Sequence, residues 1–343
     1  MLLSAVLLGS CALSLSSSAQ NAPADTASAH IAAALKATGT EHIGIFNTTC
    51  GQLYPRVPRL VQNAPLPPPS GVRPANDRDQ STWQAKPAKV FDNVYWLGEH
   101  NTRPGNPAAW AIDTSDGIII IDALHANSIQ HQVVDGLKSL GLDPKRIKYV
   151  LVTHAHTDHF GGARYLQDTY GARVIMGAGD WEYMEKRGSP EPMPKRDMTI
   201  KAENGEKFTL GKTTMTLYLT PGHTPGTVSI LLPVTDRGVP HLAAMWGGSG
   251  MPFDPDDANA KKLQVATVYH NSVKRFGDIA ARAGADILFA NHPYLDLAEE
   301  KNAKLAKRGA NDPNPYVIGK ARTKAYMDIA VECTAAGMVS FRK

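Results

Sequence analysis

The sequence predicts an α/β protein built as a layered sandwich of two similar halves. From Trp83 onward, short apolar runs bounded by turn residues alternate with helical patterns. Each half ends in a strand followed by a histidine-containing loop, first after residues 147–153 and again after 287–290. The continuous apolar run at 118–121 is typical of a strand that is buried on both faces. Together these features indicate a pseudo-duplicated sandwich.

The first half alternates strands with helices. The expected strands lie at 91–98, 110–114, 117–122, 147–153 and 173–176, and the expected helices at 127–140 and 162–169. The second half begins with strands. Segments 199–210 and 213–219 are expected to pair as a hairpin, followed by strands at 228–234, 242–245 and 287–290 and by helices at 260–283 and 315–336.

The overall composition is that of a folded protein, with 343 residues of which 43% are hydrophobic and 20% charged. The net charge is only +4 and no basic run is present, so a nucleic-acid partner is not indicated. A long apolar stretch occurs only within the first 19 residues, so we expect no transmembrane segment in the mature chain.

The N-terminus resembles an export signal. Residues 2–15 are apolar or small, and Ser17-Ser18-Ala19 fits a signal-peptidase site, so residues 1–19 are predicted to be a signal peptide and the protein periplasmic or secreted. The segment lacks a Lys or Arg before the apolar run. Residues 8–11 also match a lipoprotein box, in which Cys11 would carry a lipid anchor.

Residues 20–82 are predicted to form an N-terminal helix at 26–38 and a Pro-rich extended arm at 60–79, ahead of a single domain at 83–343. Without the signal, two cysteines remain, Cys50 and Cys333. An oxidising compartment would allow them to form a disulfide, and two unrelated thiols are the alternative.

The chemistry is concentrated in one loop after the strand at 147–153. His154, His156, Asp158 and His159 fall within six residues. Imidazole nitrogens and carboxylate oxygens suit divalent zinc, which takes about four ligands. The spacing lets His154 and His156 point to one ion while Asp158 and His159 turn toward a second.

Each ion then needs a further ligand from elsewhere in the chain. His223 lies in the tight turn Pro221-Gly222-His223-Thr224-Pro225-Gly226, and His292 follows the strand at 287–290. We therefore expect one site made by His154, His156 and His223, and a second made by Asp158, His159 and His292.

The order of these motifs resembles the metallo-β-lactamase superfamily, and the similarity runs from about Trp83 to the C-terminus. The turn at 114–117, the strand end Ile121-Asp122 and, more weakly, Gly179-Asp180-Trp181 also look like that superfamily. The resemblance implies a four-layer αββα sandwich with two zinc ions per chain. It also makes Asp122 a candidate hydrogen-bond acceptor behind a ligand histidine, with the capping of a turn as the alternative.

The stretch between His223 and His292 separates the branches of the superfamily. Glyoxalase II and acyl-homoserine lactonases carry a bridging Asp there, whereas residues 243–250 of this chain contain no acid. The pattern is similar to the third subclass of class B β-lactamases, with three histidines in one site and Asp-His-His in the other. Gly247 or Gly248 stands where that subclass usually has Ser, and Gly248 and Ser249 are the residues we expect near the substrate.

This resemblance implies that a metal-bound hydroxide opens the amide of a β-lactam, the expected small-molecule substrate, and that Asp158 orients the nucleophile and handles a proton. Such an activity would confer antibiotic resistance. Two alternatives stay open. The same site can hydrolyse another lactone, ester or amide, or the protein can bind metal without catalysis.

Overall fold

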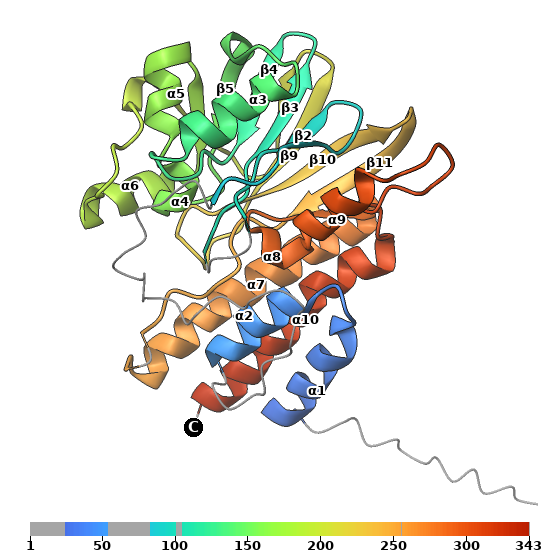
Figure 1. Cartoon of the computed structure of the whole chain (residues 1–343). Helices are drawn as coiled ribbons and strands as arrows, with labels where there is room; N and C mark the ends of the chain where they lie inside the picture. The colour runs from blue at the N-terminus through green and yellow to red at the C-terminus, as the bar shows by residue number, and fades with distance from the viewer. Residues whose placement is uncertain (1–24, 54–82, 101–104, 255, 343) are drawn as a thin grey trace, which may run out of the picture.

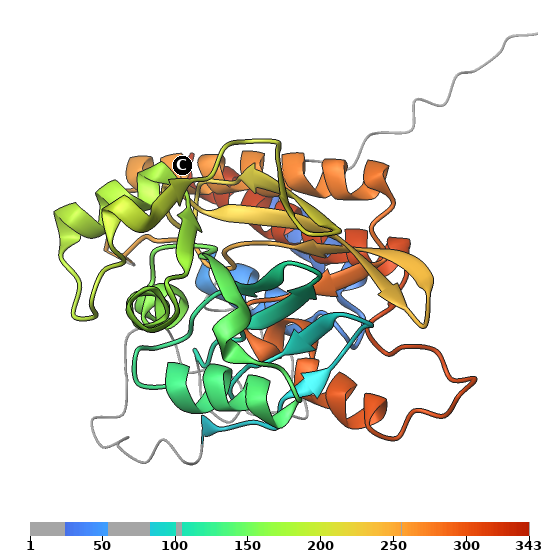
Figure 2. The same ribbon diagram turned by 90° about the horizontal axis from the view of Figure 1, so that it is seen from above.

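Two β-sheets stacked face to face form the centre of the molecule, with helices on both outer sides (Figure 1, Figure 2). The computed structural model describes residues 25–53, 83–100, 105–254 and 256–342. The expected signal peptide, Cys11 and the Pro-rich arm lie outside the described residues. The architecture is the αββα sandwich that the resemblance implied.

The first sheet has seven strands in sequence order. They are β1 (Ala88–Lys89), β2 (Val94–Trp96), β3 (Trp110–Thr114), β4 (Gly117–Ile121), β5 (Ile147–Leu151), β6 (Arg173–Met176) and β7 (Thr199–Lys201). Strands β1 to β4 pair antiparallel, and β4 to β7 pair parallel. The parallel strands therefore all end at the same edge of the sheet.

The second sheet has five strands in the order β12-β11-β10-β9-β8. They are β8 (Glu206–Leu210), β9 (Thr213–Leu219), β10 (Val228–Asp236), β11 (Val239–Met245) and β12 (Ile287–Phe289). Only β11 and β12 pair parallel, and the other neighbours are antiparallel. The C-terminal end of β12 leads into the loop that carries His292.

The prediction of a doubly buried strand at 118–121 is confirmed. Ile119 and Ile121 pack into the core between the two sheets, together with Leu217, Ile230 and other residues of the second sheet. Ile118 and Ile120 pack on the opposite side, against the outer helices. Because neighbouring side chains of a strand point to opposite faces, both faces of β4 must be apolar.

Helices of the first half cover the outer face of the first sheet (Figure 1). They are a π-helical segment at Ile129–Val134 that leads into α3 (Asp135–Ser139), then α4 (Thr157–Phe160), α5 (Ala163–Tyr170) and α6 (Ala178–Arg187), with short 3-10 turns at Pro144–Arg146 and Arg196–Met198. The helices expected at 127–140 and 162–169 are both present, with slightly different ends.

The second sheet is covered by α7 (Asn259–Ala283) and α10 (Lys320–Phe341), and the short α8 (Pro293–Asp296) and α9 (Ala298–Leu305) lie between β12 and α10 in sequence. In α7 the buried residues Tyr269, Val273, Phe276 and Ala280 recur every three or four positions, the spacing of one helical face. Gly284 ends α7 with a left-handed φ of 81°. The helices expected at 260–283 and 315–336 are thus confirmed.

Two N-terminal helices, α1 (Ala27–Thr38) and α2 (Ile43–Leu53), pack against α10 and share its core cluster (Figure 1). The prediction of a helix at 26–38 is confirmed. Helix α2 was not predicted, because Asn47, Thr48, Thr49 and Gly51 give it weak helix propensity. Its buried residues, which include Ile45, explain why it forms: tertiary packing stabilises it.

The prediction of a single strand at 199–210 is wrong. Residues Thr199–Lys201 form β7 at the edge of the first sheet, whereas Glu206–Leu210 form β8 of the second sheet. The turn between them contains Gly205, whose φ of 80° favours glycine. The chain changes sheets here, and local periodicity does not show which sheet a strand joins.

None of the helices in the described part of the chain combines the length and the apolar character that spanning a bilayer requires.

Candidate metal centre

The six expected ligands come together at one edge of the sandwich. His154 and His156 lie in the loop after β5, Asp158 and His159 lie on or beside α4, and His292 follows β12. His223 comes from the turn between β9 and β10. In that turn Gly222 has a φ of 142°, and a Cβ there would lie 2.6 Å from the Cα of Tyr269 in α7, so only glycine fits.

The first group contains three histidines. His223 Nε2 lies 3.0 Å from His154 Nε2 and 3.1 Å from His156 Nδ1. All three potential ligand atoms lie within 4.8 Å of one another. We call this group the three-histidine cluster.

The second group contains Asp158, His159 and His292. His159 Nε2 lies 3.3 Å from both Asp158 Oδ2 and His292 Nε2, and His292 Nε2 lies 3.9 Å from Asp158 Oδ2. These atoms too lie within 4.8 Å of one another. We call this group the Asp-His-His cluster. The structure therefore assembles the two groups that the spacing predicted.

The outer nitrogens of four ligand rings all meet hydrogen-bond acceptors. His154 Nδ1 donates to Gly247 O (2.8 Å) and His223 Nδ1 donates to Gly250 O (2.6 Å). His292 Nδ1 donates to Asn106 O (3.0 Å) and His159 Nδ1 donates to Asp122 Oδ2 (2.8 Å). Because these acceptors carry no hydrogen, each outer nitrogen donates its own hydrogen and each ring turns its Nε2 toward its cluster. This arrangement, with five imidazoles and one carboxylate, fits divalent zinc.

The two clusters differ in their electrostatics. Burial lowers the pKa of His154 and His223 well below the usual range of histidine, so the three-histidine cluster is neutral. Burial also acts to lower the pKa of His159, but Asp158 and Asp122 outweigh it and raise that pKa to about 10. The Asp-His-His cluster thus lies in the field of two carboxylates.

Comparison with known proteins agrees with this geometry. The family model described as "Metallo-beta-lactamase superfamily" matches residues 102–237. Over these residues the chain is similar to the metallo-β-lactamase superfamily. Among solved structures of the superfamily, it is similar to BJP-1, a subclass B3 metallo-β-lactamase of Bradyrhizobium japonicum, with 25% identity, a TM-score of 0.57 and coverage of 72% of this chain and 92% of that one. It is also similar to the native FEZ-1 metallo-β-lactamase from Legionella gormanii, with 22% identity, a TM-score of 0.59 and coverage of 71% and 92%.

Curated relatives in the superfamily carry other names. A hydroxyacylglutathione hydrolase of Brucella anthropi is 32% identical over 164 residues, which are 48% of this chain and 57% of the relative. The N-acyl homoserine lactonase AttM of Agrobacterium fabrum is 31% identical over 111 residues, which are 29% of this chain and 41% of the relative. The chain spans about half the length of the curated relatives it matches.

Asp122 contacts both a ring of the Asp-His-His cluster and the start of the ligand loop. Besides holding the His159 ring, its carboxylate accepts hydrogen bonds from Thr153 N (2.7 Å) and Thr153 Oγ1 (2.8 Å). It is fully buried and has a left-handed φ of 59°. One carboxylate therefore links the end of β4, the start of the ligand loop and the ring of His159.

Asp180 is a second buried carboxylate, and the sequence analysis did not assign it a role. It accepts hydrogen bonds from Ala155 N (2.8 Å), Thr224 Oγ1 (2.8 Å) and Gly226 N (2.6 Å), and so joins the loop of His154 and His156 to the turn of His223. Burial raises its pKa to about 6, against the opposing effect of these hydrogen bonds. The Gly-Asp-Trp match to the superfamily was the available signal, but its partners lie far away in sequence.

The segment after β11 lies directly against the clusters. A Cβ on Gly248 would be 2.4 Å from the Cβ of His223, and a Cβ on Gly247 would be 2.1 Å from Val228 O. The backbone at Gly247 and Gly248 therefore leaves no room for a side chain in this structure. Asn291, whose role was also not predicted, donates from Nδ2 to Gly247 O at 3.0 Å and so supports the same segment.

Ser249 directly follows Gly248, which lies against His223, but the side chain of Ser249 is turned into the protein. It is only 5% exposed, and its Oγ lies 3.5 Å from the Oη of Tyr326 in α10. Gly248 thus lies against the three-histidine cluster, whereas Ser249 contacts the helix layer.

Proposed function

We propose that this protein is an exported metal-dependent hydrolase that opens the amide bond of β-lactams. The observation that carries the proposal is the close contact of Gly248 with the ring of His223, in a stretch without any acid. The bridging Asp of glyoxalase II and of the lactonases has no counterpart there, and the ligand set matches that of the third β-lactamase subclass. The similarity to BJP-1, which covers nearly all of that enzyme, supports the same assignment.

His154, His156 and His223 would hold one zinc ion, and Asp158, His159 and His292 the other. Bound there, two divalent ions supply an activated water and polarise the substrate carbonyl. Asp158 is the single carboxylate among the six ligands and remains partly exposed, with 20% of its side chain accessible. It is therefore our proposed catalytic residue, which orients the attacking water and accepts its proton.

The residues behind the ligands keep this geometry ready before substrate binds. Asp122 holds the His159 ring, and the carbonyls of Gly247 and Gly250 hold His154 and His223. Pre-arranged groups of this kind reduce the reorganisation that catalysis requires. Gly248 remains our proposed substrate-side residue and contributes space and backbone, whereas the expectation for Ser249 is dropped because its side chain contacts Tyr326 in the helix layer.

A second candidate function is hydrolysis of a thioester or lactone. It is favoured by the curated relatives, among them the hydroxyacylglutathione hydrolase of Brucella anthropi and the N-acyl homoserine lactonase AttM. The absence of an acid from residues 243–250 argues against this second function.

The test is hydrolysis of a chromogenic cephalosporin by the mature chain, with and without a chelator and beside a His156→Ala variant. Parallel assays use a hydroxyacylglutathione thioester and an acyl-homoserine lactone. We expect cephalosporin turnover that chelation and the substitution abolish. Turnover of only the thioester or the lactone would reject the β-lactamase proposal in favour of the second candidate, and bound metal without any turnover would reject both.

The export proposal has its own test. We expect the chain expressed from Met1 to lose residues 1–19, which intact-mass measurement of the periplasmic fraction detects directly. A mature N-terminus at Cys11 that carries lipid would instead establish the lipoprotein alternative. An unprocessed chain retained in the cytoplasm would refute export.

A further inference from the structure

The ligand His223 depends on a loop for its orientation. Its Nδ1 donates to Gly250 O at 2.6 Å, and Gly250 lies in the segment 246–254, which has no helix or strand. A carbonyl in such a segment is held only by the contacts that its neighbours make. What fixes the backbone at Gly250 therefore also fixes the metal-facing nitrogen of His223.

Gln52, near the end of α2, makes that contact. Its Oε1 accepts a hydrogen bond from Met251 N at 3.0 Å. A Cβ on Gly250 would lie 3.2 Å from Gln52 Nε2, so the side-chain amide covers both residues of the loop. Met251 is 5% exposed and belongs to the core cluster that contains Leu53 of α2. Helix α2 thus holds the loop that orients His223.

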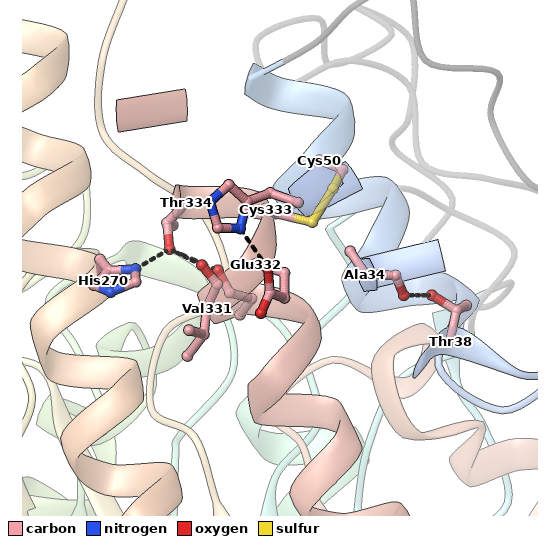
Figure 3. The surroundings of a disulfide bond; sticks show 10 residues. Ala34, Thr38, Cys50, His270, Val331, Glu332, Cys333 and Thr334 are labelled. Carbon is pink, nitrogen blue, oxygen red and sulfur yellow. Dashed lines mark hydrogen bonds and ion pairs between the residues drawn. A yellow bond between two sulfur atoms is a disulfide. The ribbon is translucent and has the colours of Figure 1, made fainter. Parts of the chain in front are cut away.

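A disulfide fixes α2 two residues before Gln52. Cys50 is bonded to Cys333 of α10, with the two Cα atoms 4.9 Å apart and a sequence separation of 283 (Figure 3). Both cysteines are fully buried. Of the two alternatives for these cysteines, the structure shows the disulfide. This disulfide fixes the helix that carries Gln52. Because α2 has weak helix propensity, its position relies on such tertiary constraints.

We propose that Gln52 is a positioning residue for the metal ligand His223, and that the Cys50–Cys333 disulfide keeps it in place. The disulfide fixes Cys50 in α2, and Gln52 follows two residues later in the same helix. Gln52 accepts a hydrogen bond from Met251, the residue after Gly250, and Gly250 O accepts one from His223. The Asp-His-His cluster is oriented by Asp122 and Asn106 and makes no use of Gln52. The inference rests on the metal binding of the proposed function and is independent of its substrate.

The experiment measures metal affinity cluster by cluster. In a His292→Ala background only the three-histidine cluster is complete, and in a His156→Ala background only the Asp-His-His cluster is complete. Co²⁺ is titrated into each background, and its visible spectrum and dissociation constant are recorded by competition with a chelator. We expect Gln52→Leu to weaken Co²⁺ binding about tenfold in the first background and to leave the second unchanged.

Two further variants separate positioning from general stability. Gln52→Glu keeps an oxygen acceptor for Met251 N and should recover most of the affinity. Gln167→Leu is the matched control, because the Oε1 of Gln167, like that of Gln52, accepts a backbone hydrogen bond, from Lys195 N at 2.6 Å, away from both clusters. It should leave Co²⁺ binding unchanged in both backgrounds.

The disulfide is tested by the double variant Cys50→Ser and Cys333→Ser, which we expect to lower Co²⁺ affinity of the three-histidine cluster in the same direction. Helix α2 also contacts Tyr294, because Thr48 Oγ1 lies 3.5 Å from the phenol oxygen of Tyr294. Loss of the disulfide can therefore act beyond the three-histidine cluster, and the Gln52 variants test whether the effect is selective for that cluster. Unchanged Co²⁺ binding in Gln52→Leu, or an equal loss in Gln167→Leu, would overturn the inference. Absence of metal binding in the wild type would instead refute the proposed function.

Discussion

The three-histidine and Asp-His-His clusters share one edge of the sandwich but are held in different ways. Backbone carbonyls of Gly247 and Gly250 orient two rings of the three-histidine cluster. A buried side chain, Asp122, orients His159 in the Asp-His-His cluster. A carboxylate can be recognised in a sequence, whereas any residue supplies a carbonyl. The two reported supports of the three-histidine cluster thus depend on the path of the backbone, whereas the Asp-His-His cluster combines one side chain, Asp122, with the backbone carbonyl of Asn106 behind His292.

The clusters also differ in charge. The three-histidine cluster offers neutral donors, so a cation bound there keeps its full positive charge. Asp158 offsets part of that charge in the Asp-His-His cluster, and Asp122 adds a second carboxylate behind His159. A cation bound in the three-histidine cluster would therefore keep more of its positive charge than one bound in the Asp-His-His cluster.

Removal of a ligand should break either cluster alone. We expect His156→Ala and His292→Ala each to lower metal affinity in one cluster by more than about a hundredfold, because a lost ligand costs more than a lost outer partner. The metal content after dialysis should then fall from near two ions per chain to near one. Two ions retained in either variant would show that the ligand assignment is wrong.

Removal of a side-chain support should separate the clusters next. Asp122→Asn weakens the hydrogen bond to His159 Nδ1, so we expect metal affinity in the Asp-His-His cluster to fall about 10- to 100-fold, measured by chelator competition in the His156→Ala background. Asp116→Asn, in an exposed turn, is the control. Equal losses in both clusters would argue that Asp122 acts through Thr153 and the whole loop.

Asp180 offers a test of the support that the two segments of the three-histidine cluster share. In Asp180→Asn one acceptor oxygen becomes an NH₂ group that faces a donor, so we expect the free energy of unfolding to fall by about 1–3 kcal/mol, measured by urea denaturation. Metal affinity should fall mainly in the three-histidine cluster, because Ala155 and Thr224 adjoin its ligands. Asp168→Asn, with 44% of the side chain exposed, should have little effect on either quantity. A stability equal to that of the wild type would contradict the role of Asp180.

The smallest expected effect concerns pH and the helix behind the three-histidine cluster. His42 precedes α2, and its Nε2 donates to Arg322 O of α10 at 2.8 Å. Burial lowers its pKa to about 4, against 6.5 for the ordinary group. Between these values the unfolded chain binds more protons, so His42 makes stability fall as the pH falls. The loss from pH 7.5 to 5.5 is about 1.4 kcal/mol.

His42→Gln keeps a donor for Arg322 O but does not titrate, so the free energy of unfolding of that variant should fall by about 1.4 kcal/mol less over the same pH range. The measurement is urea denaturation of metal-free protein at pH 7.5 and 5.5. His131→Gln, with 57% of the side chain exposed, is the control and should change the pH dependence much less. An identical pH dependence in His42→Gln and the wild type would contradict the assignment.

Much of the fold and the six side chains of the two clusters could be predicted from the sequence. Strands β3 and β6 and helix α7 follow their apolar patterns closely, because periodicity reflects the face that an element buries. The ligands were accessible because chemistry restricts zinc to a few residue types at short spacing. The strand at 199–210 was predicted wrongly and α2 was missed, because sheet membership and the docking of a weak helix depend on distant partners.

The order of the elements and the residue types of the loop at 154–159 follow from the amino-acid sequence, since each depends on neighbours within a few positions along the chain, whereas the packing of the two halves brings His223 and His292 to that loop. The pairing of Cys50 with Cys333, the bridging role of Asp180 and the support of His223 by Gln52 arose from the folded chain. These contacts join segments that lie far apart in sequence, and no local propensity encodes them. Packing of the two halves and of the N-terminal helices brings them within hydrogen-bonding distance.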